Sequence, residues 1–428
     1  MKSSHYSFKP LNIGRIVIWS LFALALAIAP LLFKSSLALT MLSQIGYLII
    51  ICLSYNILLG QGGMLSFGHA VYTGLGSFIA IHAMNMAGQP IPLVLIPLVG
   101  GVAGLGFAVL LGFVTTKKSG TTFAMITLGI GELVASMALM FPEFFGGEGG
   151  ITTNRVYGKP FLGMTFGSQM EVYYLIAVYC FACTVAMFAF TGTPLGRILN
   201  AVRDNPERVE FIGYNTQRVR YFAFIIAGFF AGIGGGLATI NFEIVTGADS
   251  LNVVRSGGYL LFTFLGGATF FFGPIIGAVL LVIASVLLSE LTKAWLLYLG
   301  LVFLFMVMYA PGGIASLIMM NLRLAKFGRL KPLIASYLGL AGTGLVAILG
   351  AAAMVEMIYH LQLNAALGPT MSFMGIQLNA TALNSWFGSA FVMLTGLGLF
   401  EVVRRHYIHQ WGEIQEAVEK DIKRAEAL

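Results

Sequence analysis

The sequence predicts an all-α fold: a polytopic transmembrane helix bundle of about 10–12 spans, some of them broken by glycine-rich stretches. Three observations support this prediction. The mean hydropathy is +0.89, and only 10% of the residues are charged, whereas soluble proteins are about 25% charged. Several apolar stretches of about 18–25 residues are long enough to cross a hydrocarbon core of roughly 30 Å. The net charge of +7 comes from residues between these stretches and forms no single basic face, so no nucleic-acid partner is expected.

Apolar runs separated by charges and turn residues are the expected spans. In order they are 16–33, 37–59, 66–86, 91–114, 121–141, 171–190, 221–242, 257–272, 274–289, 294–310, 333–357 and 385–403. The runs 257–272 and 274–289 are short and meet at Gly273-Pro274. They form either two half-crossings or two tilted short helices.

The first run is expected to be a retained span rather than a cleaved signal. Lys2, Lys9 and Arg15 precede it, but no small-residue cleavage site follows it. The cysteines predict no disulfide framework. Cys180 and Cys183 form a C-x-x-C inside an apolar run with no second pair, which favours two small buried side chains over a metal or redox site.

Lysine and arginine concentrate in cytoplasmic loops, so their distribution predicts the orientation. With the N-terminus inside and the spans alternating, 19 of the 24 basic residues fall on the cytoplasmic side. Both termini and the charged segment 191–220 are therefore expected in the cytoplasm. The basic residues left outside are Lys34, Arg155, Lys159, Arg255 and Lys293.

Four parts are expected along the chain: an N-terminal span at 1–34, a core domain at 35–320, a basic connector with two extra spans at 321–403, and a cytosolic amphipathic helix at 404–428. The last helix is expected because apolar residues recur at helical spacing, whether against the membrane or against a partner. They are Trp411, Ile414, Val418, Ile422 and Ala425.

No motif in the chain indicates catalysis. There is no G-x-x-x-x-G-K-[ST] phosphate loop, no metal-ligand cluster and no nucleophile elbow. Ionisable groups inside spans, which ion-driven carriers use, are also few. Glu132 lies near the middle of a span, where it serves either a helix-to-helix hydrogen bond or a pathway. His69 is either a packed residue or part of that pathway.

Two glycine-rich stretches predict broken helices. "GQGGMLSFGHAVYTGLGSF" (60–78) and "FLGGATFFFGPIIGA" (264–278) each place a Gly-Gly pair shortly before a Phe-Gly step. Paired interruptions in two halves of a transporter indicate the translocation pathway, although close helix packing also explains glycine. The predicted pathway residues are Gly62, Gly63, Ser66, Phe67, Gly68, His69, Glu132, Gly266, Gly267, Gly273 and Pro274.

Other glycines recur four residues apart within spans. Gly100 and Gly104 form one such set, and Gly228, Gly232 and Gly236 form another. This spacing predicts close helix packing within the bundle.

The segment "TPLGRILNAVRDNPERVEFIGYNTQRVR" (193–220) predicts two short amphipathic helices. Thr193-Pro194 and Asn205-Pro206 are each a capping residue followed by proline at the first helical position. Leu195, Ile198, Leu199 and Val202 share one face, Val209 and Ile212 share another, and Gly213 is a helix stop. A loop that only fixes topology explains the arginines, but these capped apolar faces favour a docking surface.

Taken in order, these stretches resemble the permease subunits of ABC importers for branched-chain amino acids, in particular the LivM-type subunit. The resemblance covers about 40–320 and rests on the motifs above together with "TLGIGELV" (127–134), "GGEGGIT" (146–152), "LGGATFFFGPIIGA" (265–278) and "LYLGLVFLFMVMYAPGGIASL" (297–317). It implies that 35–320 is a core ABC permease domain in a multi-pass protein of the bacterial inner membrane.

The resemblance also implies partners: a second permease subunit, two cytoplasmic ATPase subunits and a periplasmic substrate-binding protein. ATP would be bound by the partner subunits, so no cofactor is expected in this chain, and it is not expected to be an enzyme. The family's coupling loop maps onto this sequence, which implies ATPase contacts at Arg197, Arg203, Asp204, Asn205, Glu207 and Gly213.

The expected function is thus the membrane-spanning subunit of an ATP-driven importer for branched-chain or related small amino acids. Alternatives are the same machinery serving urea or short amides, an ion-coupled secondary transporter or channel, and a membrane scaffold. The residues after about 320 depart from the family pattern, so their role and the subunit stoichiometry are left open.

Overall fold

The computed structural model describes residues 13–86, 90–157, 165–326, 328, 331–363 and 368–427. Lys2, Lys9 and Lys159, which the predicted orientation uses, lie outside these ranges. The chain forms two compact units. The first runs to Ile283 and includes Pro311–Ala315, and the second comprises Ala284–Ala310 and Ser316–Leu428.

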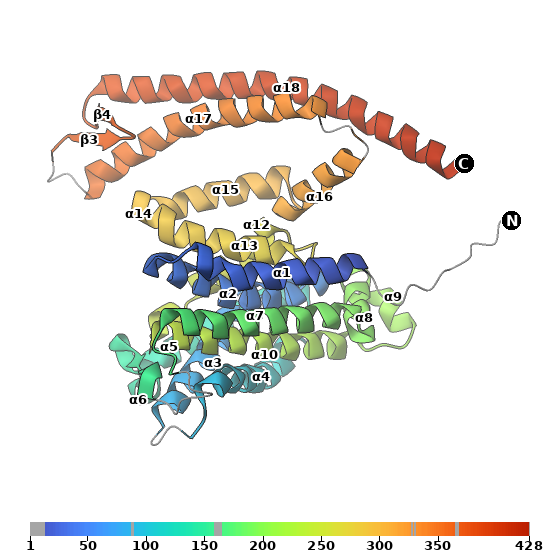
Figure 1. Ribbon diagram of the computed structural model, residues 1–428, viewed down its shortest axis with the longest axis vertical. Coiled ribbons are helices and arrows are strands. Elements are labelled where there is room, and N and C mark those ends of the chain that lie inside the picture. Colours follow the sequence, from blue (N-terminus) through green and yellow to red (C-terminus); the bar gives the residue numbers. More distant parts are fainter. Residues whose placement is uncertain are drawn as a thin grey trace. The chain divides into compact units, whose positions relative to one another are not determined.

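The first unit is a helix bundle (Figure 1). Its helices are α1 (Ile13–Leu32), α2 (Ser36–Asn56), α3 (His69–Asn85), α4 (Ile96–Thr115), α5 (Gly120–Met140), α6 (Pro142–Phe145), α7 (Gln169–Gly192), α8 (Pro194–Asp204), α9 (Pro206–Phe211), α10 (Thr216–Phe242), α11 (Gly247–Ser250), α12 (Val253–Gly266) and α13 (Gly273–Val282). A π-helix, η1 (Ile57–Gln61), extends α2, and 3₁₀ turns lie at η2 (Leu93–Leu95), η3 (Gly147–Gly149) and η4 (Arg155–Tyr157).

The centre of this unit is built on close glycine contacts between α3, α4 and α10. A Cβ placed on Gly232 would lie 2.2 Å from the Gly100 carbonyl oxygen, and one on Gly104 would lie 2.3 Å from that of Gly228. Only glycine allows backbones to approach so closely. The packing predicted from the four-residue glycine spacing is therefore confirmed.

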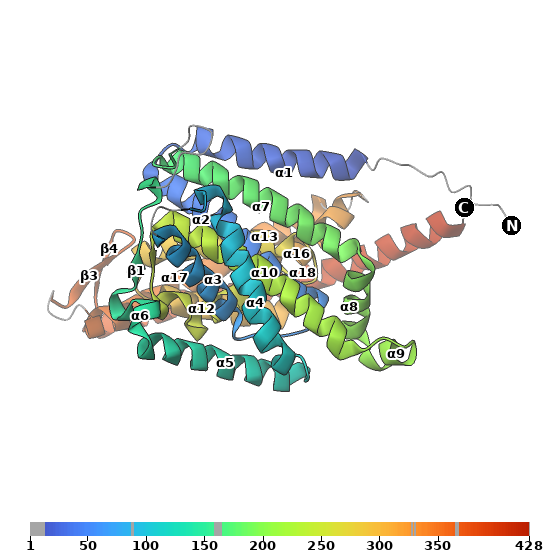
Figure 2. The ribbon, with the colours of Figure 1, turned by 90° about the horizontal axis from the view of Figure 1, so that it is seen from below.

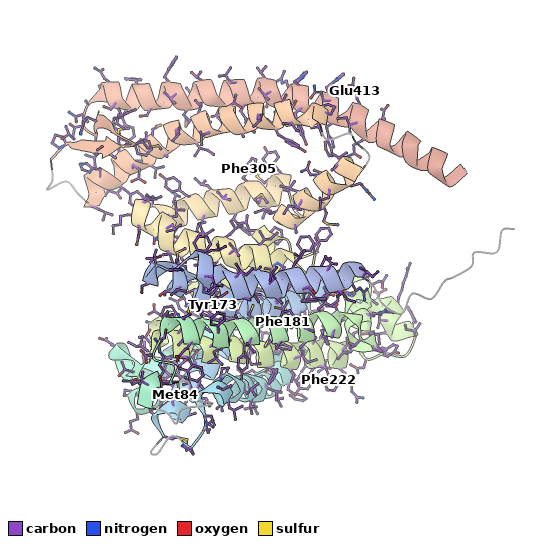
Figure 3. The ribbon with its side chains drawn as sticks, in the orientation of Figure 1. Met84, Tyr173, Phe181, Phe222, Phe305 and Glu413 are labelled. Atoms are coloured by element: carbon purple, nitrogen blue, oxygen red, sulfur yellow. The ribbon has the colours of Figure 1, made fainter. Side chains whose placement is uncertain are left out.

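The rim of the unit is held by aromatic and backbone contacts. Figure 2 shows α1 and α5 at opposite edges, with α2, α3 and α10 between them. On the α1 side, the Tyr173 hydroxyl of α7 donates to the Leu26 carbonyl at 2.7 Å, and Trp19 packs edge-on against Phe181. Figure 3 labels Tyr173 and Phe181 along α7. Cys180 and Cys183 are buried and unbridged in α7.

A polar network fixes the loop between α5 and α7. Strands β1 (Ile151–Thr152) and β2 (Ile244–Val245) pair antiparallel. Beside them, the Arg155 amide donates to the Glu243 carboxylate at 2.8 Å, and its guanidinium donates to Gln169 at 3.2 Å. The loop is thereby tied to the end of α10.

The second unit contains the remaining helices. They are the π-helix η5 (Ile283–Leu288), which begins at the unit boundary, α14 (Ser289–Leu291), α15 (Trp295–Tyr309), most of α16 (Gly313–Lys326), α17 (Lys331–Leu363) and α18 (Leu383–Ala427). The long helices α17 and α18 pack together, and a hairpin of β3 (Thr370–Phe373) and β4 (Ile376–Asn379) joins them. The last expected span and the expected tail helix are one continuous helix, α18.

The membrane bundle predicted from the sequence is confirmed. In the described residues, nine helices are long and apolar enough to cross a membrane, or up to ten if the bent pair α15–α16 is one span. Two of the expected spans are shorter than predicted. Glycine-rich stretches replace the start of one and the end of the other. α3 begins at His69 rather than at residue 66, and α12 ends at Gly266 rather than at residue 272.

Candidate functional site

The segment after α7 folds into the two capped helices that the sequence predicts. The Thr193 hydroxyl accepts from the Gly196 amide at 3.2 Å, and the Asn205 side chain accepts from the Arg208 amide at 3.0 Å. Gly213 ends the second helix with φ +92°. These caps satisfy amide groups that have no partner in the first turn of a helix. We call α8 and α9 together the coupling segment.

The apolar face of α8 is buried against the bundle. Leu199 is 0% exposed and Val202 5% exposed. A Cβ on Gly62, just after η1, would lie 3.2 Å from the Leu199 methyl carbon Cδ1. α8 is therefore seated on the end of η1, while Arg197, Asp204 and Glu207 of the coupling segment stay exposed.

Arg203 reaches from α8 into the backbone of η1. Its guanidinium donates to the Gly60 carbonyl and also pairs with the adjacent Asp204 carboxylate at 2.9 Å. A bond from a charged donor to a carbonyl is stronger than a neutral one. The coupling segment is thus fixed to the first glycine-rich break by both apolar packing and a charged hydrogen bond.

The first break is a π-helix followed by a left-handed turn. Gly63 has φ +62°, a conformation that side chains with a Cβ rarely adopt, and a Cβ there would lie 2.8 Å from Arg203 Cγ. Single-turn π segments are frequent at functional sites. The sequence predicts this break, and the structure adds that Arg203 packs on it.

The second break lies directly against the first. A Cβ on Gly60 would be 2.1 Å from the Ala268 carbonyl oxygen. Within the second break, Gly267 has φ +117°, and a Cβ on Gly273 would lie 2.0 Å from the Gly267 carbonyl oxygen. The two interruptions, about 200 residues apart in the printed sequence, therefore form one structure.

A third Gly-Gly pair completes this structure. Gly313 has φ +70°, and a Cβ there would lie 2.5 Å from the Cα of Gly267. Gly312 contributes a carbonyl oxygen 2.7 Å from the Cβ position of Gly267. This pair was not predicted from the sequence, although "APGG" is a helix-break signal of the same kind. We call the three breaks, 60–68, 266–273 and 312–313, the glycine junction.

The far end of the first break is held by α2 and α5. The Tyr55 hydroxyl donates to the Ser66 carbonyl at 2.7 Å, and the Phe67 amide donates to the Thr127 hydroxyl of α5 at 3.1 Å. A Cβ on Gly68 would lie 2.4 Å from the Thr127 carbonyl oxygen. α5 therefore packs tightly on the junction.

His69, which begins α3, is completely buried, and its Nε2 lies 2.8 Å from the Ser54 hydroxyl. Three buried polar atoms near this position have no hydrogen-bond partner among the described residues: Asn56 Oδ1, Ser66 Oγ and His69 Nδ1. Unsatisfied buried groups are destabilising and uncommon in proteins.

The structure separates the predicted pathway residues into two groups. Ten of the eleven predicted residues lie in or directly beside the glycine junction and most of them are buried, whereas Glu132 lies on the exposed side of α5. The assignment of both groups to a pathway stays a prediction. The geometry shows that the junction joins helices and that Glu132 faces away from it.

The tip of the coupling segment is apolar and exposed, a feature that was not predicted from the sequence. Phe211 is 88% exposed, Ile212 71% and Tyr214 46%. Val209 and Ile212, which were expected on one face, differ in exposure, because α9 ends at Phe211 and the turn at Gly213 redirects the chain. Val209 alone is buried, at 3% exposure. Exposed apolar clusters of this kind mark interaction surfaces.

The coupling segment lies between an exposed outer surface and the glycine junction. In the described residues, no group of three or more His, Cys, Asp or Glu side chains is arranged to hold a metal ion. The coupling segment presents charged and apolar groups on its outer side, and its inner side is fixed to a junction that joins the end of α2, the end of α12 and the Gly312-Gly313 turn.

The chain was compared with known proteins. A model of the branched-chain amino acid transport system permease component matches residues 37–311. The LivM permease protein of the high-affinity branched-chain amino acid transport system of Salmonella typhimurium is 28% identical over 305 residues, which is 66% of this chain and 71% of that protein. The Escherichia coli LivM protein is 27% identical over 298 residues, 64% and 69% of the two chains.

More distant relatives include a probable branched-chain amino acid permease, LivH, of Methanocaldococcus jannaschii, 22% identical over 52% of this chain and 71% of that protein. No solved structure matches the chain. Because the family model covers well over half of the sequence, this multi-pass membrane protein belongs to the branched-chain amino acid transport system permease family.

Proposed function

We propose that the chain is the membrane-spanning subunit of an ATP-driven ABC importer that takes up branched-chain or related small amino acids. The observation that carries this proposal is the coupling segment: two capped helices seated on the glycine junction through Leu199 and Arg203, with an exposed charged and apolar outer side. A connector that only joins two spans does not need to be packed against the glycine junction. A helix pair that transmits movement from another subunit does need this contact.

The source of energy is assigned to partner subunits. The sequence has no phosphate loop, so nucleotide binding is placed in two ATPase subunits that contact Arg197, Asp204, Asn205, Glu207, Gly213 and the Phe211 tip. A second permease subunit and a periplasmic binding protein complete the assembly, in the inner membrane of a bacterium. The charge asymmetry of the loops supports a cytoplasmic coupling segment.

Transmission would follow the contacts in order. Movement of α8 acts on η1 through the Arg203 bond to the Gly60 carbonyl, and η1 acts on the second break through Ala268. Packed cores switch between discrete arrangements, so small displacements at such a junction are converted into helix movements. Thr127 passes the movement on to α5.

The relatives bear on the substrate. Both LivM proteins belong by name to branched-chain amino acid transport. A guanosine ABC transporter permease, NupQ of Bacillus subtilis, is 32% identical, but over only 18% of this chain. The longer matches favour amino acids.

The test is purification of the assembly from its native membrane, identification of the co-purified proteins and reconstitution into proteoliposomes. ATP-dependent uptake of labelled leucine, isoleucine or valine, given the co-purified binding protein, is the expected result. Uptake of urea or guanosine instead would change the substrate. Uptake driven by an ion gradient without ATP or partners would overturn the proposal.

A further inference from the structure

The connection between α17 and α18 carries no charge. Residues 361–400 contain no Asp, Glu, Lys, Arg or His, whereas the connection between α5 and α7 contains Glu143, Glu148 and Arg155. Charged side chains are mostly found where proteins meet water, because desolvation is what excludes them elsewhere. An uncharged connection between two membrane-length helices therefore indicates surroundings other than bulk water.

The hairpin of β3 and β4 in this connection has two chemically different faces. Successive side chains of a strand point to opposite faces, so neighbouring cross-strand pairs alternate between them. On one face the pairs are apolar, Met371 with Leu378 and Phe373 with Ile376. On the other face they are polar and uncharged, Thr370 with Asn379 and Ser372 with Gln377. The hairpin is thus amphipathic without using a charge.

The hairpin is held against the ends of both helices. β3 packs against α17, and His360 Nε2 at the end of α17 lies 2.8 Å from the Gly368 carbonyl oxygen. The Trp386 indole at the start of α18 donates to the Ala380 carbonyl at 2.8 Å. Figure 1 shows the hairpin beside these helix ends. Its depth relative to a membrane is therefore set by the two helices.

The tip of the hairpin is strained and apolar. Met374 has φ +49° and Gly375 has φ +84°, and two-residue turns of this kind favour Asn-Gly. A bulky side chain at positive φ is uncommon. Met374 is nevertheless 77% exposed, and Ile376 beside it is 64% exposed. Because neither the conformation nor the exposure favours these residues in water, they indicate an apolar environment at the tip.

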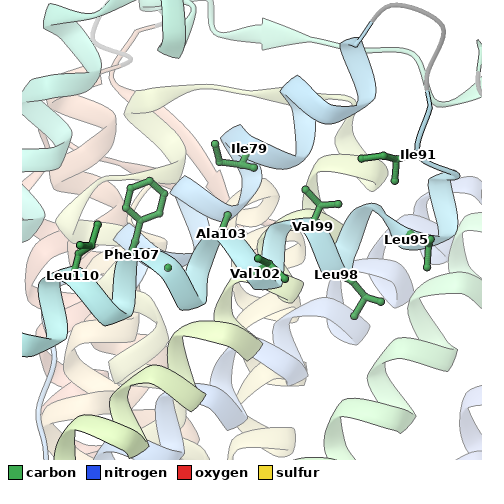
Figure 4. A pocket seen from close by; sticks show the side chains of 10 residues that line it. Ile79, Ile91, Leu95, Leu98, Val99, Val102, Ala103, Phe107 and Leu110 are labelled. Atoms are coloured by element: carbon green, nitrogen blue, oxygen red, sulfur yellow. The ribbon is translucent and has the colours of Figure 1, made fainter.

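The surface next to the hairpin has the same character. Leu383 and Phe387, in the first turns of α18, are 70% and 71% exposed. A groove of about 680 Å³ beside α4, another membrane-length helix, is likewise lined by apolar residues such as Ile79 and Val102 (Figure 4). Surfaces of this composition suit acyl chains, and Trp386 is of a type enriched at the membrane–water interface.

We propose that the β3–β4 hairpin lies in the interfacial layer of the lipid bilayer, with Met374 and Ile376 toward the acyl chains and the polar face toward the headgroups. A two-stranded sheet has an unpaired backbone edge on each strand, and such edges do not occur in hydrocarbon. The hairpin therefore stops at the interface, where amphipathic segments insert roughly 5–10 Å.

This placement gives the α17–α18 pair a third contact with the membrane, besides its two spans. The orientation predicted from lysine and arginine puts that contact in the external leaflet. The contact belongs to residues beyond the family region, which ends at 311. It does not depend on the substrate or on the ATPase subunits.

Fluorescence quenching measures the depth of the tip in the full chain. The native cysteines are buried, so Met374→Cys, Glu148→Cys and Val102→Cys are each labelled with a nitrobenzoxadiazole and reconstituted into phosphatidylcholine vesicles. These contain a phosphatidylcholine with its nitroxide either near the headgroup or near the acyl-chain end. The shallow nitroxide should quench the Met374 label at least about twofold more than the deep one, because the tip lies at the headgroup boundary.

The two other labels calibrate this result. Val102 is expected to show the reverse preference, and Glu148, in a charged connection, the weakest quenching by both lipids. Quenching of the Met374 label no stronger than that of Glu148 would overturn the proposal. Aqueous iodide then identifies the alternative: a label that iodide quenches lies in water, and a label shielded from both iodide and nitroxide is covered by protein.

Adjacent residues on opposite faces test the amphipathic placement. Ile376→Asp and Gln377→Asp each add one negative charge to the Met374→Cys chain. Only Ile376→Asp should lower quenching by the shallow nitroxide, by about twofold or more, because its carboxylate is driven out of the acyl boundary. Equal decreases would show that the two faces are not distinguished and would overturn the orientation. If Ile376→Asp disrupts the hairpin, the depth of the Met374 label alone still decides the proposal.

Discussion

Arg203 acts on the backbone of another helix rather than only on solvent or a partner. Its guanidinium donates to the Gly60 carbonyl, and Asp204 holds it from the other side. Arg208, five residues later, is exposed, and its backbone amide donates to the Asn205 cap. Comparing variants of these two arginines therefore distinguishes the loss of the contact with η1 from the loss of one positive charge.

Replacement of Arg203 by Ala is expected to uncouple transport. Loss of a charged hydrogen bond is worth about 1.5–3 kcal/mol, so the number of substrate molecules moved per ATP should fall about tenfold while the ATPase subunits still co-purify. Arg208→Ala is the control and should keep the ratio. If Arg203→Ala instead releases the ATPases, the arginine is a docking residue and the transmission role is wrong.

Gly63 allows a second test at this scale, because Gly120 has the same φ of +62° but nothing near its Cβ position. Alanine at either position adopts a left-handed conformation that costs roughly 1–2 kcal/mol. Only at Gly63 does the new methyl also press on Arg203 Cγ, at 2.8 Å.

Both alanine variants should therefore lower the midpoint of thermal unfolding in detergent, but only Gly63→Ala should lower ATP-driven uptake. Combining Gly63→Ala with Arg203→Ala should give less than the sum of the two losses, because the residues share one contact. Equal uptake by the two glycine variants would show that backbone strain alone is responsible.

At the scale of elements, local signals predicted local structure. Thr193-Pro194, Asn205-Pro206 and Gly213 give the start of α8, the start of α9 and the stop after it, because a cap is made by residues within one turn. The breaks at Gly62-Gly63 and Gly266-Gly267 could likewise be predicted from the sequence. The contact between the two breaks, through Gly60 and Ala268, could not.

The reason is physical. Gly60 and Ala268 meet through backbone atoms, which are the same in every residue, so no pattern of side chains records which break meets which. The exposed tip at Phe211 was missed for a related reason: periodicity assigns Ile212 to the face of Val209 only if the helix continues, and it ends one residue earlier. The outward position of Glu132 also depends on which side of α5 the junction occupies.

The exposed Phe211 side chain is predicted to contact an ATPase subunit. Phe211 is 88% exposed at the end of the coupling segment, whereas Phe222, at 51% on α10, serves as a matched exposed phenylalanine outside it. Burial of an aromatic side chain at an interface contributes several kcal/mol when it is a central contact.

We therefore expect Phe211→Ala to weaken co-purification of the ATPase subunits about tenfold or more, and Phe222→Ala to leave it unchanged. The measurement is the ATPase-to-permease ratio after purification at a series of dilutions. Equal ratios for both variants would remove the tip from the docking surface.

At the scale of the whole molecule, the second unit combines the end of the family region with the extra helices. The family model ends at residue 311, yet residues 284–310 form one compact unit with 316–428. Glu356 of α17 explains part of this arrangement, because it accepts hydrogen bonds from Thr292 and, at 3.1 Å, from the Tyr298 hydroxyl of α15. The helix α15 is thus supported by a chain segment that the family pattern lacks.

Deletion of 332–428 tests what this support is for. The coupling segment and the glycine junction belong to the first unit, so the truncated chain should still insert and co-purify with ATPase subunits. Its thermal midpoint should fall, because Thr292 and Tyr298 lose their acceptor, and Glu356→Gln in the full chain should reproduce part of that decrease. Glu401→Gln, which removes only a pairing with Arg404 and Arg405 within α18, is the control. Loss of ATPase co-purification on deletion, with the first unit still folded, would instead make the extension part of the coupling surface.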